Sequence, residues 1–208
     1  MASDDPWPLI HAEREALAAD LATLTDEQWA TPSLCDGWTV RDVVAHMTAT
    51  AKMTPPKFFG EFIGSGFRFN AMTAKDVARE RGASPSETLA GFRDRMGAST
   101  HPPGPIDAMV GEVAVHPEDI RRPLGISHSY PADLLTRAAD FYKSSNLLIG
   151  GKKRVAGLTL KATDVDWTSG SGPEVTGPML SMVLMIAGRR SALAELSGEG
   201  VSTLQSRM

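Results

Sequence analysis

Apolar residues at helical spacing mark most of the first 150 positions of the chain. Residues 7–24 place leucines along one stripe of a helix, and residues 39–53 do the same with valines. Proline and serine start signals precede later helices. The segments predicted to be helical are residues 7–24, 25–30, 39–53, 84–96, 104–116 and 131–150. This succession predicts a mainly α protein.

Local start signals support two of these helices. Thr25 and Thr39 are each followed, three residues later, by Gln28 and Asp42. Such pairs form capping boxes, in which two backbone N–H groups at a helix start are bonded by side chains. We therefore expect helices that begin directly after Thr25 and Thr39.

Two regions depart from the helical pattern. Residues 55–70 combine five phenylalanines with three glycines, which is compatible with a mobile lid over a pocket or with a loop packed on the helices. Residues 154–167 alternate apolar and polar positions imperfectly, which indicates strands, and residues 179–188 read as a buried helix. We therefore predict a helical domain over 1–150 and a small α/β segment over 151–208.

Composition and charge exclude several classes of protein. The net charge is −4 in 208 residues, so no basic surface for nucleic acid is expected. No segment approaches the roughly 18 apolar residues of a membrane span, and the start of the chain has no apolar signal core. The single cysteine, Cys35, excludes an internal disulfide and fits a reducing compartment. We expect a cytoplasmic protein that binds neither nucleic acid nor membrane.

Candidate chemistry gathers on two of the predicted helices. His46 lies at the edge of the apolar face of residues 39–53, and Glu112 and His116 are one helical turn apart near the apolar edge of the next candidate helix. A buried glutamate is costly unless it is paired or bound to a cation. Two histidines and a carboxylate suit zinc or a similar divalent ion, with a fourth position left open. The alternative is a packing helix with ordinary hydrogen-bonded histidines.

Other familiar catalytic signatures are absent from the sequence. It contains neither a zinc-protease H-E-x-x-H motif, nor a phosphate-binding loop, nor a nucleophile elbow. Cys35 has no partner in a C-x-x-C motif and is interpreted as a small packed residue rather than a nucleophile.

Three stretches of the chain resemble one known family. They are LTDEQWATPSLCDGWTVRDVVAHM (24–47), GEVAVHPEDIRRPLG (111–125) and residues 157–201. Together they resemble the actinobacterial, mycothiol-dependent maleylpyruvate isomerase family of DinB-like metalloproteins. The resemblance implies a DinB-like four-helix bundle that holds a divalent metal, most often zinc, on one histidine and on the glutamate and histidine of an E-x-x-x-H motif. Those positions fall on His46, Glu112 and His116.

The resemblance also implies a function. Members of the family use the metal to activate a low-molecular-weight thiol, mycothiol, whose thiolate attacks a small electrophile. We therefore expect a mycothiol-dependent isomerase or S-transferase with a metal-bound thiolate as nucleophile, in a monomer or a homodimer. The alternative is a non-catalytic metal-binding bundle, such as a sensor or a ligand-binding protein.

Two features depart from the family pattern. Pro117 follows His116 directly and predicts a kink or a restart of the helix at that point. The C-terminal segment is shorter than the second domain of the isomerase, in which an arginine faces the substrate; Arg189 is the candidate counterpart. Arg121 and Arg122 are further candidates for binding a carboxylate substrate, or ion-pair partners of the acidic residues beside them.

Overall fold

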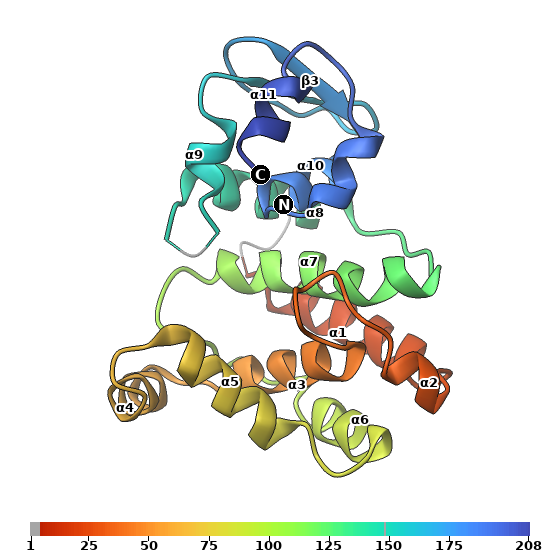
Figure 1. Cartoon of the computed structure of the whole chain (residues 1–208), viewed down its shortest axis with the longest axis vertical. Helices are drawn as coiled ribbons and strands as arrows, with labels where there is room; N and C mark the ends of the chain where they lie inside the picture. The colour runs from red at the N-terminus through yellow and green to blue at the C-terminus, as the bar shows by residue number, and fades with distance from the viewer. Residues whose placement is uncertain (1–4, 148) are drawn as a thin grey trace. The chain divides into compact units, whose positions relative to one another are not determined.

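The chain forms two compact units, Met1–His128 and Ser129–Met208. A computed structural model describes residues 5–147 and 149–208 (Figure 1). In the first unit the helices are α1 (Trp7–Leu21), α2 (Asp26–Trp29), α3 (Val40–Ala51), α4 (Pro55–Gly64), α5 (Phe69–Glu80), α6 (Pro85–Arg93) and α7 (Asp107–Leu124). The second unit contains α8 (Ala132–Ser144), α9 (Gly151–Val155), β1 (Thr159–Ala162), β2 (Thr168–Gly170), β3 (Glu174–Gly177), α10 (Met179–Ile186), a 3₁₀ turn (Arg190–Glu195) and α11 (Val201–Ser206).

Helix α3 is the centre of the first unit. It packs against α5, α6 and α7, while α1 packs against α6 and α7, and Figure 1 shows α1, α3 and α7 running side by side. Val43, Val44 and Met47 of α3 are fully buried, as are Val110 and Val113 of α7. The predicted mainly α bundle is confirmed, because the apolar stripes read from the sequence face one another in this core.

The predicted helix starts are present. Thr25 and Thr39 accept hydrogen bonds from the backbone N–H groups of Gln28 and Asp42, whose side chains bond back to the cap residues. Both capping boxes are therefore complete, and they fix where α2 and α3 begin.

Helix α7 is longer than the sequence predicted. It continues through Pro117 and Pro123 and ends at Gly125, whose φ of 69° is left-handed. Of the kink or restart expected at Pro117, the restart is wrong and the kink stays a prediction. A proline removes one backbone donor, here the N–H that would bond to the carbonyl of Val113, and the buried packing on both sides of Pro117 keeps the remaining turns helical. Glu112, His116 and Asp119 consequently lie on one unbroken helix.

The segment 55–70 is mostly helical rather than a loop. It forms α4, which has no buried residue, a short turn and the start of α5. Phe59, Ile63, Phe67 and Phe69 are exposed, whereas Phe58 and Phe62 stack on each other. Whether this segment moves as a lid stays a prediction.

The second unit holds a small mixed sheet of order β2-β1-β3. β1 pairs antiparallel with β2 and parallel with β3, with Leu160 opposite Ser169 and Val175. The buried helix α10 packs against α8, and the predicted C-terminal α/β character is confirmed. In the sequence, the two compact units meet between His128 and Ser129, so α8 belongs to the second unit. The domain boundary expected at residue 150 stays a prediction. In the described ranges, no helix is long and apolar enough to cross a membrane.

Candidate metal centre

The three predicted ligands lie on the two packed helices α3 and α7. His46 is in the middle of α3, and Glu112 and His116 are one turn apart on α7. The rings of His46 and His116 meet edge to face, with centroids 5.0 Å apart. Two helices that the sequence separates by about 60 residues therefore bring these side chains into one region of the bundle.

Glu112 is a buried carboxylate with one uncommitted oxygen. Its residue is 8% exposed, and Oε1 has no hydrogen-bond partner among the described residues. Burial raises the pKa of Glu112, against the opposing charges of Arg14 and His116 and a hydrogen bond with Thr50. An unpaired buried carboxylate oxygen is costly, and a bound cation is one of the few partners that satisfies it.

His46 is held in its neutral form. Burial, followed by the nearby His116, lowers the pKa of His46 to about 3. Trp38 packs against it with ring centroids 5.2 Å apart, so this tryptophan forms part of the wall around the imidazole. A neutral imidazole offers a free lone pair, which is the form that binds metal.

Asp119 orients the second histidine. Its Oδ2 lies 3.0 Å from Nδ1 of His116, and Asp119 itself is fully buried. Burial lowers the pKa of His116, but hydrogen bonds with Asp119 and Cys35 prevail and raise it to about 10. With Nδ1 engaged by a carboxylate, Nε2 is the nitrogen that would bind a metal once the metal displaces its proton, an arrangement that recurs around histidine ligands.

A second group of ligand atoms shares the same histidine. Cys35, His116 and Asp119 have donor atoms within 4.8 Å of one another, the one such group of three among the described residues. Cys35 Sγ lies 3.1 Å from Asp119 Oδ2 and 3.9 Å from His116 Nδ1. The contacts of Asp119 with Cys35 and His116 have hydrogen-bond lengths, so we interpret Cys35 and Asp119 as residues that orient His116.

The types of ligand in the predicted set suit a divalent metal, although the one group of three donor atoms within 4.8 Å of one another in the described ranges belongs to Cys35, His116 and Asp119. Two imidazoles and a carboxylate match three-ligand sites for zinc, and the orphaned Oε1 of Glu112 is the observation from the structure that favours a cation. The assignment of His46, Glu112 and His116 as ligands stays a prediction, taken up below.

Sequence reasoning missed the supporting residues. Asp119 is one of the acidic residues that precede Arg121 and Arg122, and its position three residues after His116 on a helix is a usable signal. Cys35 is expected to be a packed residue, and no pattern in the sequence indicates that its loop reaches α7, where the N–H of Leu34 also donates to the carbonyl of Asp119.

The three arginines proposed as substrate contacts have partners within the protein. Arg121 is fully buried and pairs with Asp20 at 2.7 Å, whereas Arg122 bonds to Glu118 at 3.0 Å, as the ion-pair alternative expected. Arg189 belongs to the second unit, where its Nη1 donates to the carbonyl of Ala187. A substrate role for any of them stays a prediction.

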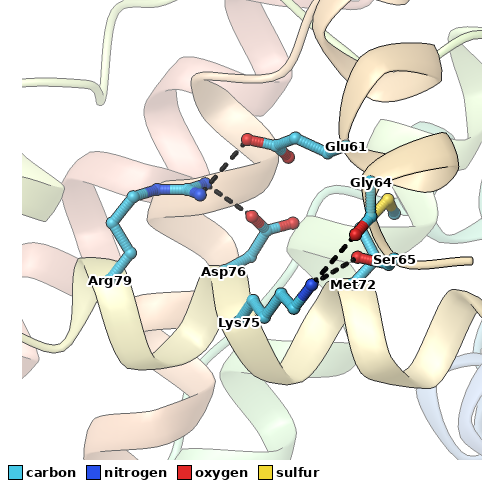
Figure 2. Close-up of a pocket in the computed structure, with 7 residues that line it drawn as sticks. All are labelled: Glu61, Gly64, Ser65, Met72, Lys75, Asp76 and Arg79. Atoms are coloured by element: carbon cyan, nitrogen blue, oxygen red, sulfur yellow. Dashed lines mark hydrogen bonds and ion pairs between the residues drawn. The ribbon is translucent and has the colours of Figure 1, made fainter.

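A separate pocket of about 220 Å³ lies between α4 and α5 (Figure 2). Arg79 spans its two carboxylates, at 3.2 Å from Glu61 and 2.5 Å from Asp76. Lys75 donates to the Gly64 carbonyl and to the Ser65 hydroxyl on the opposite side. None of the predicted metal ligands lines this pocket, and its polar contacts join α4 to α5.

One family model matches part of the first unit. Residues 10–101 match the family described as the mycothiol maleylpyruvate isomerase N-terminal domain. The matched region includes His46 and ends before Glu112 and His116. No curated protein shows significant similarity.

Two solved structures share the fold of this chain. They are crystal structures of the mycothiol-dependent maleylpyruvate isomerase and of a histidine-to-alanine mutant of it, with TM-scores of 0.64 and 0.66. Each is 15% identical and the alignment covers 93% of this chain and 91% of the other. The DinB-like fold that the sequence predicted is therefore confirmed over nearly the whole chain.

Proposed function

We propose that this protein is a metal-dependent enzyme that uses a low-molecular-weight thiol, mycothiol, to isomerise or conjugate a small electrophile. The metal, most simply zinc, would be held by His46, Glu112 and His116. The observation that carries this proposal is the buried, unpaired Oε1 of Glu112 on the helix of His116, whose ring contacts that of His46, in a chain whose residues 10–101 match this family's N-terminal domain.

Each of the chain's own groups has a definite part. His46 presents a neutral imidazole because burial keeps the proton off its ring. His116 is oriented by Asp119 through Nδ1, so that Nε2 points away from that bond. Glu112 would supply the negative charge that a divalent cation requires.

A divalent ion at these ligands would lower the pKa of a thiol, so that the thiolate, the nucleophilic form, prevails at neutral pH. Trp38 covers His46 on one side and helps to exclude water from that face. A thiolate that adds to a conjugated double bond and later leaves allows cis–trans rotation; one that remains attached gives a thioether. The similarity to the isomerase supports the first outcome, and a cytoplasmic, reducing setting suits both.

The test combines metal content with thiol-dependent turnover. Natively purified protein should contain about one zinc ion per chain, and it should isomerise maleylpyruvate or conjugate 1-chloro-2,4-dinitrobenzene only when mycothiol is added. His116→Ala and Glu112→Gln should lower both metal content and turnover. His101→Ala is the matched control, because His101 lies beside Trp7 and away from the proposed ligands, and it should change neither.

The outcome that overturns the proposal is equally concrete. Protein that takes up no divalent metal after dialysis against zinc, and whose Glu112→Gln variant is indistinguishable from the parent, would mark α7 as a packing helix. Metal at full occupancy without turnover on either substrate would leave the non-catalytic alternative.

A further inference from the structure

Arg14 is a fully buried charge with incomplete hydrogen bonding. It lies on α1 at 0% exposure, and its Nη1 donates to the carbonyl of Ala98 at 2.9 Å. Its Nε and Nη2, the two donors on one edge of the guanidinium, are buried without a partner among the described residues. A cation in such a position destabilises the protein unless another charge compensates it.

The charge of the other fully buried arginine of this unit is compensated by an ion pair. Arg121 on α7 is also 0% exposed, but it forms a direct ion pair with Asp20, with Nη2 2.7 Å and Nε 2.8 Å from the same carboxylate oxygen. Arg14 forms no such ion pair with a carboxylate in the described part of the chain.

Glu112 is the carboxylate whose charge acts on Arg14. Helix α1 packs against α7, on which Glu112 sits with its own unpaired oxygen. Burial lowers the pKa of Arg14 and raises the pKa of Glu112, and the attraction between the two groups opposes both shifts. Two incompletely bonded groups of opposite charge therefore lie within electrostatic reach inside the same core, where the low dielectric strengthens their interaction.

We propose that Arg14 is a positioning residue for Glu112: its guanidinium balances the charge of this carboxylate and holds it in the bundle interior, ready for a cation. The inference deepens the proposed function and rests on it for the role of Glu112 as a ligand. The pairing itself is a property of the metal-free protein. A divalent ion would take over the neutralisation of Glu112, so that the stabilising effect of Arg14 is largest when no metal is bound.

The test is a double-mutant cycle in the presence of a chelator. The thermal midpoint is measured for the parent, Arg14→Met, Glu112→Gln and the double variant. Arg14→Met should lower the midpoint by about 3–8 °C more in the parent than in the Glu112→Gln background, because only the parent has a charge left uncompensated. Arg14→Lys keeps the charge and should recover at least half of this difference.

Two controls separate positioning from simple packing. Arg121→Met removes a buried arginine that pairs with Asp20, and its effect should be the same in both Glu112 backgrounds to within about 2 °C. Saturating zinc should reduce the penalty of Arg14→Met in the parent by half or more, while the penalty of Arg121→Met stays unchanged. If Arg14→Met does not fold, the same cycle with Arg14→Lys carries the test with a smaller expected difference.

Equal losses from Arg14→Met in both backgrounds would overturn the inference and reduce Arg14 to its bond with the Ala98 carbonyl. A coupling that is present in chelator and unaffected by saturating zinc would overturn the link to the metal. Failure of the proposed function looks different: no metal uptake and no turnover, with the coupling in chelator intact, which would uphold the Arg14–Glu112 pairing on its own.

Discussion

The hydrogen bond between Asp119 and His116 can be tested by comparing two adjacent buried carboxylates. Asp119 is fully buried and lies 3.0 Å from Nδ1 of His116, whereas Glu118 is 4% exposed and bonds to Arg122, whose side chain is 22% exposed, at 3.0 Å. Asp119→Asn removes a charge-assisted bond in the interior, worth about 1.5–3 kcal/mol. Glu118→Gln removes an i,i+4 pair worth about 0.3–0.5 kcal/mol.

These free energies convert to clearly different thermal midpoints. At about 2–4 °C per kcal/mol for a chain of this size, Asp119→Asn should lower the midpoint by about 3–12 °C and Glu118→Gln by about 2 °C or less. Unfolding is followed by circular dichroism at pH 6 in chelator, so that metal does not contribute. Equal shifts for the two variants would refute the idea that Asp119 holds His116.

The pH dependence of this effect has a definite sign. The pKa of His116 is raised to about 10 in the folded protein, above roughly 6.5 in an unfolded chain. The bond therefore contributes its full stability below pH about 6.5, and the contribution falls as the pH rises toward 10. The difference between parent and Asp119→Asn should narrow between pH 6 and pH 9.5. A difference that widens over that interval would contradict the assignment of a protonated His116.

Three smaller predictions follow from the same contacts. Cys35→Ser should keep the metal content and most thiol-dependent turnover, since the nucleophilic sulfur belongs to the cosubstrate; complete loss of turnover in folded protein would place the nucleophile on the chain. Thr39→Ala should lower the thermal midpoint by about 2–4 °C through loss of the cap of α3, and no change would mean that the capping box is unimportant. Gly125→Ala should cost a similar amount, because its φ of 69° is strained for alanine although no atom lies within 4 Å of the added carbon; an unchanged midpoint would argue against the left-handed end of α7.

Local signals in the sequence predict much of this fold. The capping boxes at Thr25 and Thr39 give the helix starts correctly because they depend on residues only three positions apart. The continuation of α7 through Pro117 was not predictable in this way. Proline lowers the intrinsic stability of a helix, and only the burial of this turn against neighbouring helices overrides that preference.

The same distinction between local signals and tertiary packing applies to the candidate site. Glu112, His116 and Asp119 are separated by helical intervals on one element, so their common face follows from sequence spacing. The contact of Cys35 with Asp119, and the packing of α1, which carries Arg14, against α7, which carries Glu112, join residues about 85–100 positions apart and depend on the tertiary structure. The spacing of apolar residues along the sequence does not indicate which helices pack together.

The central claim is that His46, Glu112 and His116 hold a metal that accepts a thiolate, and X-ray absorption spectroscopy at the zinc edge tests it most directly. Zinc-loaded protein should show only nitrogen and oxygen neighbours at about 2.0–2.2 Å, and addition of mycothiol should introduce one sulfur neighbour at about 2.3 Å. A sulfur neighbour before any thiol is added, lost in Cys35→Ser, would place the metal on Cys35, His116 and Asp119 instead. A spectrum unchanged by mycothiol would contradict the thiolate mechanism.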